Sequence, residues 1–256
     1  MHKDIYKLER MALKESILHK LNPKIKLIIV LMIIIYGNFQ NNIVSLIVLG
    51  IYLIFLLFLS GLLFEGLKRM LLIMPFGIFL ALFQPFFRGE EVVYHLFIFP
   101  IYREGIIFGL TMFLKFLISI IAITILATTT PMYEVIGAMR GLGLPNIMAT
   151  LLGLMVRYLF LMYEILEKTL SAQNVRCFNR YNLKYKSVLK TFGYTIGTLF
   201  VRSYEQGNKT YWAMVSRGYN ANSKVVSDKT TINYNDVIFL IITLFIILLS
   251  HLLTYL

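Results

Sequence analysis

Charged residues are scarce in this chain. They make up 15% of its 256 residues, whereas 58% are hydrophobic. Soluble domains usually carry about 25% charged residues, so this composition argues against an ordinary soluble enzyme. The single cysteine, Cys177, excludes an internal disulfide framework. No Gly-x-x-x-x-Gly-Lys-Ser/Thr segment occurs, so the chain has no phosphate-binding loop of its own.

Histidines are equally scarce. The four are scattered at His2, His19, His95 and His251. They form no His-Glu-x-x-His motif and no close cysteine–histidine cluster, so we expect no metal site. His95 lies near two acidic residues and is interpreted either as a surface residue without a role or as a contact for a passing metal ion. A membrane-embedded lipid enzyme would need a His or acidic cluster at the membrane surface, and the sequence offers none.

Acidic residues are few as well, 13 against 25 Lys and Arg, which leaves a net charge of +12. The basic excess lies in two stretches: residues 1–26 hold 7 basic and 3 acidic side chains, and residues 128–234 hold 13 and 5. Basic residues beside transmembrane segments mark the cytoplasmic side. The charge therefore predicts topology, with both stretches in the cytoplasm, and we expect no nucleic-acid partner.

Apolar runs dominate the rest, and mean hydropathy is +0.74. A spanning helix needs roughly 17–25 residues. Five runs fit, with the first extended at its start so that Lys24 and Lys26 reach the lipid headgroups. The five predicted spans are residues 21–36, 43–59, 71–87, 106–128 and 236–256. The interspersed charges at the N-terminus do not indicate a cleaved signal peptide.

The spans define three segments. Residues 1–128 hold a cytoplasmic N-terminal segment and four spans, residues 129–234 form a cytoplasmic domain, and residues 235–256 form the last span. Within 129–234 we predict a short amphipathic helix over 131–140 and long helices over 146–176 and 187–217, each about 45 Å long. Residues 147–163 are apolar enough to be a sixth span with Arg157 buried. That alternative would move the following lysines outside, so we favour a helix along the cytoplasmic face.

The two long helices end in similar sequences. AQNVRCFN occupies residues 172–179 and AMVSRGYN occupies residues 213–220, which places Arg176 and Arg217 at equivalent positions. An arginine at a helix C-terminus is favoured by the helix dipole alone. Its planar guanidinium also suits docking on carboxylates and backbone carbonyls of a partner. Because the block recurs in the same context, we favour docking.

The sequence resembles the transmembrane coupling (T) component of energy-coupling-factor (ECF) transporters, which are prokaryotic ABC-type importers. LHKLNPKIKL at residues 18–27 is similar to the family's opening Leu-Asp-Pro-Arg-x-Lys-Leu. Residues 142–145, Arg157 and Glu164 resemble its Gly-x-Pro, Arg-Phe and Glu landmarks. Arg176 and Arg217 fall on its two Ala-Arg-Gly motifs, here Val-Arg-Cys and Ser-Arg-Gly. Residues 199–219 are similar to the cobalt/nickel branch.

The resemblance implies an all-α polytopic membrane protein with about five transmembrane helices and a cytoplasmic coupling domain of two long crossed helices. It implies no catalysis and no cofactor in this chain, because ATP is bound by a cytoplasmic ABC ATPase dimer. It also implies a separate substrate-binding membrane subunit and a location in the prokaryotic cell membrane with the N-terminus in the cytoplasm. The expected ATPase-docking residues are Arg176, Arg217, Val175, Cys177, Ser216 and Gly218.

The sequence leaves alternatives for the support residues and for the substrate. Polar side chains on the long helices either hold the two helices together by ion pairing or form a solvated face; they are Arg157, Glu164, Arg202 and Glu205. The imported substrate is cobalt or nickel ion, or a vitamin if the component is shared among several substrate subunits. A stand-alone secondary carrier is disfavoured, because the spans show no matching halves.

Overall fold

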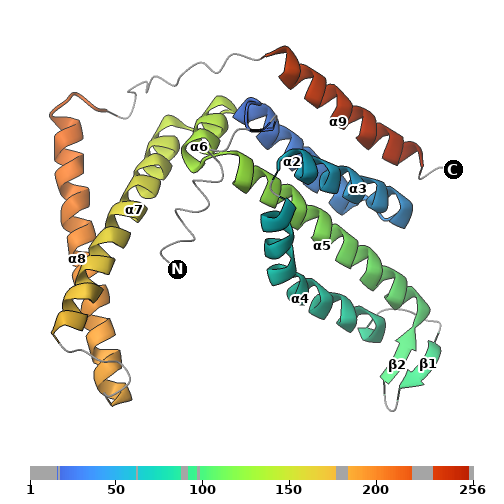
Figure 1. The fold of residues 1–256 in the computed structure, drawn as a ribbon, viewed down its shortest axis with the longest axis horizontal. Coiled ribbons are helices and arrows are strands. Elements are labelled where there is room, and N and C mark those ends of the chain that lie inside the picture. Colours follow the sequence, from blue (N-terminus) through green and yellow to red (C-terminus); the bar gives the residue numbers. More distant parts are fainter. Residues whose placement is uncertain are drawn as a thin grey trace. The chain divides into compact units, whose positions relative to one another are not determined.

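The structure, a computed structural model, describes residues 16, 18–61, 63–87, 92–96, 99–176, 184–220 and 233–253. The described part is almost entirely helical, as Figure 1 shows. The chain divides into two compact units. We call Met1–Ala138 with Asp228–Leu256 the bundle unit and Met139–Ser227 the helix-pair unit. The expectation that residues 129–234 lie on the cytoplasmic side of the membrane stays a prediction.

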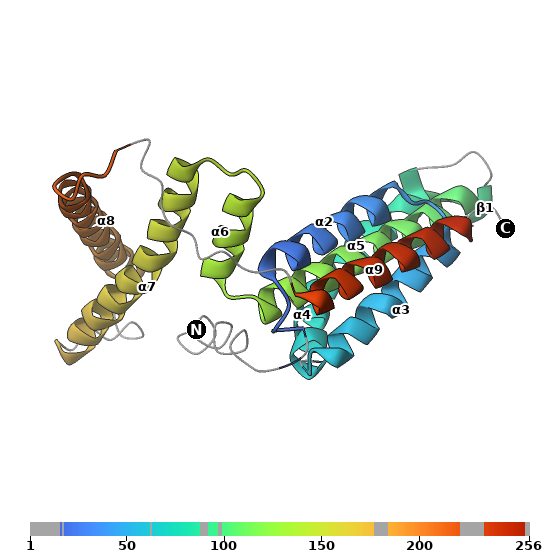
Figure 2. The ribbon, with the colours of Figure 1, turned by 90° about the horizontal axis from the view of Figure 1, so that it is seen from above.

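Four helices of the bundle unit share one core, and they lie side by side in Figure 2: α2 (Pro23–Phe39), α3 (Ile43–Leu59), α5 (Arg103–Thr129) and α9 (Tyr234–Leu252). Asn22 begins α2 and Asn42 begins α3, and each side chain accepts the amide two residues on. Ile33, Leu49 and Ile118 are each at most 2% exposed and meet in this core. Burial of these branched side chains from separate helices is what holds the bundle together.

Another helix of the bundle unit, α4 (Leu63–Phe87), packs on α5 through glycines. A Cβ atom at Gly109 of α5 would lie 2.7 Å from the backbone oxygen of Ala81 on α4. A Cβ atom at Gly77 of α4 would lie 2.3 Å from the Phe116 ring. Small residues that let backbones approach closely are typical of helix contacts in membranes.

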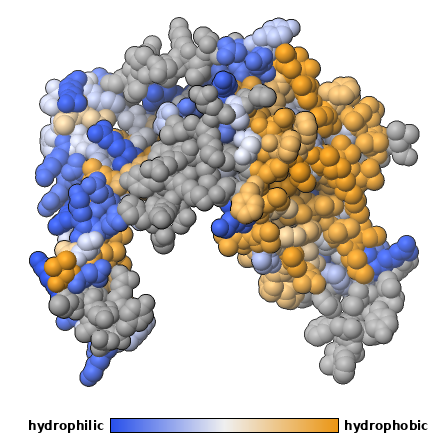
Figure 3. All heavy atoms as spheres, in the orientation of Figure 1, coloured by the Kyte–Doolittle hydropathy of each residue, from blue (hydrophilic) through white to orange (hydrophobic). Residues whose placement is uncertain are grey.

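Within the described residues, four helices are long and apolar enough to cross a membrane: Gly66–Pro85 within α4, Arg103–Thr129, Asn146–Val175 and Tyr234–Leu252. Ile43–Leu59 is a shorter apolar helix. Large apolar side chains cover the outside of the bundle unit in Figure 3. The fold class is therefore confirmed: this is an all-α polytopic membrane protein.

One span boundary was wrong. The helix that contains the third predicted span begins at Leu63 rather than at residue 71, so most of the segment between the second and third predicted spans is helical. The sequence pattern did not reveal this early start, because Lys68 and Arg69 interrupt the apolar run. Between the third and fourth predicted spans, the structure contains a two-stranded antiparallel hairpin, β1 (Val92–Leu96) and β2 (Phe99–Tyr102).

The helix-pair unit contains two long helices, as predicted. They are α7 (Asn146–Val175) and α8 (Tyr185–Val215), preceded by α6 (Met132–Gly141), within which the division between units falls. Gly143, in the left-handed region at φ 108°, ends α6 by donating to Arg140 O while Leu144 N donates to Met139 O. These boundaries agree with the predicted helices within two residues at each end.

Candidate docking site at two helix ends

Three side-chain contacts between α7 and α8 show in which direction the two helices run. The hydroxyls of Tyr158 and Thr210 are hydrogen-bonded, and the Ser203 hydroxyl lies 3.2 Å from the sulfur of Met162. Further along, the Gln173 amide donates to the Thr195 hydroxyl at 2.8 Å. As the residue number rises on α7 it falls on α8. The two helices are therefore antiparallel, and they cross in Figure 1.

Antiparallel packing separates the two arginines. The end of α7 lies level with the first third of α8, whereas Arg217 lies beyond the last turn of α8. At 1.5 Å per residue, the intervening helix spans about 35 Å. Figure 1 shows the end of α7 low and the end of α8 high on the helix pair. One compact patch on a partner cannot contact both arginines, so each needs its own docking place.

The end of α8 is a Schellman motif. Tyr219 N–H donates to Met214 O at 3.0 Å, and Gly218 N–H donates to Val215 O at 2.9 Å. Gly218 has φ 81°, a left-handed conformation that glycine adopts without a Cβ penalty. Arg217 directly precedes this turn and is exposed, as are Ser216 and Gly218. The glycine thus stops the helix at a point that leaves the arginine at its tip.

The end of α7 places its arginine in the same way. Arg176 follows the last helical residue, its N–H donates to Ala172 O at 3.2 Å, and its side chain is exposed. Val175 beside it is 84% exposed, unusual for a large apolar side chain. Cys177, the remaining predicted docking residue, lies outside the described residues. An exposed arginine next to an exposed valine is suited to a pocket with an apolar wall and carboxylate or carbonyl groups.

None of the three contacts between α7 and α8 described above involves a predicted support residue. These residues are Arg157, Glu164, Arg202 and Glu205. Glu164 binds Lys168 on its own helix at 2.6 Å, an exposed pair one turn apart. Arg157 is exposed, and Arg202 and Glu205 border an open hollow along α8 together with Gly193 and Gly197. The three contacts between α7 and α8 use neutral side chains instead. Ion pairing between the helices stays a prediction.

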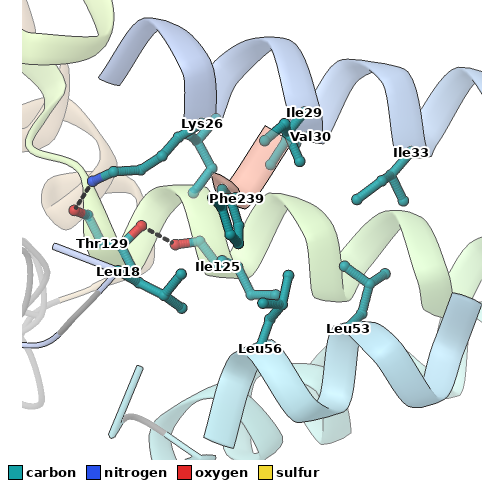
Figure 4. A pocket seen from close by; sticks show the side chains of 11 residues that line it. Leu18, Lys26, Ile29, Val30, Ile33, Leu53, Leu56, Ile125, Thr129 and Phe239 are labelled. Carbon is teal, nitrogen blue, oxygen red and sulfur yellow. Dashed lines mark hydrogen bonds between the residues drawn. The ribbon is translucent and has the colours of Figure 1, made fainter. Parts of the chain in front are cut away.

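One buried charge was misjudged from the sequence. Lys26 does not reach toward headgroups: it is 5% exposed, and its ammonium donates to Thr129 O at 3.1 Å. Figure 4 shows this bond beside a cavity of about 20 Å³ with an almost wholly apolar lining. The signal that points to Lys26 is its place in the opening motif, where a lysine follows Asn-Pro by three residues.

No group of three or more His, Cys, Asp or Glu side chains suited to a metal ion occurs in the part of the chain that the structure describes. His251 stacks edge-on against Tyr36 at 6.3 Å between ring centroids, and His19 accepts a hydrogen bond from Ser16 or donates one to it at 2.6 Å. His2 lies outside the described residues.

The fold and the two helix ends define a polytopic membrane protein with an attached pair of long antiparallel helices tipped by exposed arginines. Residues 14–227 match the family described as cobalt transport protein (CbiQ). The chain belongs to this family and is a transmembrane component of energy-coupling-factor transporters. It is thus a membrane-bound part of a transport system.

Individual relatives agree with this assignment. An uncharacterized protein of Methanocaldococcus jannaschii is 31% identical over 247 residues, which cover 92% of this chain and 89% of the relative. The energy-coupling factor transporter transmembrane protein EcfT of Streptococcus equi is 29% identical, with 80% of each chain covered. The EcfT protein of Bacillus subtilis is 25% identical over 80% of this chain and 81% of its own length.

Proposed function

We propose that this chain is the coupling subunit of an ECF-type importer. In this function it transmits movement of two cytoplasmic ATPases to a separate substrate-binding membrane subunit. The observation that carries the proposal is the pair of exposed arginines at opposite ends of antiparallel helices, about 35 Å apart along α8. Two equivalent tips match a partner that offers the same groove twice, which a dimer of ATPases does.

The chain itself is non-catalytic in this proposal. It carries no phosphate-binding loop, so ATP is bound and hydrolysed by the partners and this subunit needs no cofactor. Arg176 and Arg217 act as points of attachment, with Val175, Ser216, Gly218 and Cys177 shaping each tip. When the ATPases close, they move the two tips, and the crossed helices pass that movement to the substrate-binding subunit.

Charge reversal at the tips tests the attachment. We expect Arg176→Glu and Arg217→Glu each to abolish transport and to weaken co-purification of the ATPases, because a guanidinium that binds carboxylates and carbonyls becomes repulsive. Lys209→Glu is the matched control, since Lys209 is an exposed cation on the same helix as Arg217. Retention of the ATPases and of transport in both tip variants would contradict the proposal.

The sidedness of the helix pair is part of the proposal, because α7 is itself long and apolar enough to cross a membrane. With α7 along the cytoplasmic face, residues after it stay in the cytoplasm. With α7 as a further span, they lie outside. Cys177 is the only cysteine in the chain, so a membrane-impermeant maleimide labels a single site. We expect labelling of inside-out vesicles but not of intact cells, with detergent-solubilised protein as the positive control.

The substrate that we propose is cobalt or nickel ion, supported by the description of the matched family and by the similarity of residues 199–219 to that branch. The substrate-binding subunit, rather than this chain, selects the ion. The alternative is a shared component for vitamin uptake, favoured by the likeness to EcfT proteins. Uptake of radioactive cobalt in cells that express the complete complex distinguishes the two, with vitamin uptake as the competing result.

A further inference from the structure

The ammonium group of Lys26 donates three hydrogen bonds, two of them to residues at the end of α5. Besides Thr129 O, its Nζ donates to Thr130 Oγ1 at 3.3 Å and to His19 O at 3.3 Å. Thr129 and Thr130 are the last residue of α5 and the residue after it, where helix carbonyls lack intrahelical partners. A cation is favoured at this end of a helix. Lys26 of α2 therefore fastens the point at which the chain leaves α5.

His19 supports the same point. Its Nε2 lies 3.3 Å from Thr128 O, and its Nδ1 lies 2.6 Å from the Ser16 hydroxyl. A neutral ring that donates from Nε2 accepts at Nδ1, so both contacts are satisfied by one tautomer. Successive carbonyls at the end of α5, from Thr128 and Thr129, are thus bound by side chains from the segment that precedes or begins α2.

Asp236 fastens the start of α9 to the same segment. It is 1% exposed, and one carboxylate oxygen accepts the Asn22 N–H at 2.7 Å while the other accepts the Asn233 N–H at 2.8 Å. The second bond belongs to a capping box that begins α9. A carboxylate is needed, because an amide side chain has one acceptor oxygen and its NH₂ group would face the other N–H.

These contacts lie in the bundle unit, close in sequence to the two places where the chain connects with the helix-pair unit. The chain enters the helix-pair unit after Ala138 and leaves it before Asp228. The end of α5 and the start of α9 are both held by the five residues from Asn22 to Lys26, although they are more than a hundred residues apart in sequence.

We propose that residues 22–26 form a clasp, with Lys26 and Asp236 as positioning residues, that joins both connections of the helix-pair unit to the bundle. The proposal rests on the proposed coupling function and deepens it. Movement of the helix pair reaches the bundle through two connecting segments of the chain. Because the clasp binds both connecting segments to α2, a movement of the helix pair displaces α2, α5 and α9 together. Without the clasp, each connecting segment would move independently of the other.

The test uses the full complex of this chain with its ATPases and substrate-binding subunit, reconstituted in vesicles. We compare the amount of substrate imported per ATP hydrolysed for Lys26→Met, Asp236→Asn and the control Lys24→Met, which changes a partly exposed lysine of the same turn. We expect Lys26→Met and Asp236→Asn to assemble and hydrolyse ATP, with import per ATP reduced about tenfold, within the usual range of coupling energies. The control should match the unmodified chain.

Hydrogen exchange provides the second measurement. In Lys26→Met, amides of residues 130–135 should exchange faster, whereas those of α3 should keep their protection. Unchanged import per ATP in the assembled Lys26→Met and Asp236→Asn complexes would overturn the clasp. So would loss of assembly with faster exchange throughout the bundle, since that result assigns the residues to stability alone. Failure of the unmodified chain to bind ATPases would instead contradict the proposed function.

Discussion

The bundle unit and the helix-pair unit hold their shapes by different means. The bundle buries side chains from four helices in one core, with Leu46 and Leu49 fully buried. Among the described residues of the helix-pair unit, Ala149 and Thr195 are the buried side chains, and large apolar groups such as Phe200 and Leu151 are exposed. Two helices with so little buried surface gain little from the hydrophobic effect. The bundle unit therefore has a packed core of its own, whereas the helix-pair unit leaves most of its apolar side chains uncovered.

The largest expected effect is on the bundle core. Leu49→Ala should lower the free energy of unfolding by about 3 kcal/mol, because it leaves a cavity in a fully packed site. Leu151→Ala on α7, where the side chain is 56% exposed, should change it by less than about 0.5 kcal/mol. Thermal unfolding of the purified chain in detergent measures both. Equal destabilisation by the two variants would break the comparison.

A smaller effect is expected where helices approach closely. Gly109→Ala should destabilise the bundle by about 1–3 kcal/mol, because the new Cβ would press on the Ala81 carbonyl. Gly197→Ala meets nothing within 4 Å on α8 and should stabilise its helix by up to about 1 kcal/mol. The same unfolding measurement applies. A lower free energy of unfolding for Gly109→Ala and a higher one for Gly197→Ala would support the contrast between the units. An unchanged free energy of unfolding for Gly109→Ala would show that α4 and α5 pack less closely than the structure indicates.

The smallest effect concerns a buried hydrogen bond. The Tyr52 hydroxyl lies 2.7 Å from that of Thr243 and joins α3 to α9. Tyr52→Phe should cost about 0.6 kcal/mol, the average for polar contacts between membrane helices. Tyr204→Phe changes a tyrosine that is 67% exposed on α8 and should leave stability unaltered. A loss in Tyr204→Phe as large as in Tyr52→Phe would mean that the helix pair is more tightly packed than its exposure indicates.

Apolar runs and helix-stop residues predicted most of the fold. The predicted and observed α3 coincide, and α7 and α8 were found within two residues, because Pro145 and Gly218 mark their ends in the sequence. The start of α4 was missed because charged residues occupy its first turns. The repeat around Arg176 and Arg217 predicted the candidate docking site from sequence, and the docking role of these residues stays a prediction. Its separation into two distant tips could not be foreseen, since that depends on the antiparallel packing.

The clasp shows the limit of reading charge from sequence. A lysine at the start of an apolar helix usually extends toward lipid headgroups, and the charge pattern alone predicts this for Lys24 and Lys26 alike. What distinguishes them is the approach of Thr129 and Thr130, more than a hundred residues away. Asp236 likewise looks like an ordinary N-terminal cap until Asn22 is placed against it.

The most direct test of the central claim is photo-crosslinking from the two tips. A photoreactive phenylalanine analogue is introduced at Val175 or Ser216, which are exposed beside the arginines, and at Tyr204 on the side of α8 as the reference position. The complex is then irradiated, and the adducts are identified by mass spectrometry. We predict adducts with the ATPases from both tip positions and none with them from the reference position. ATPase adducts from the reference position, with none from the tips, would contradict the assignment of Arg176 and Arg217 as the points of attachment.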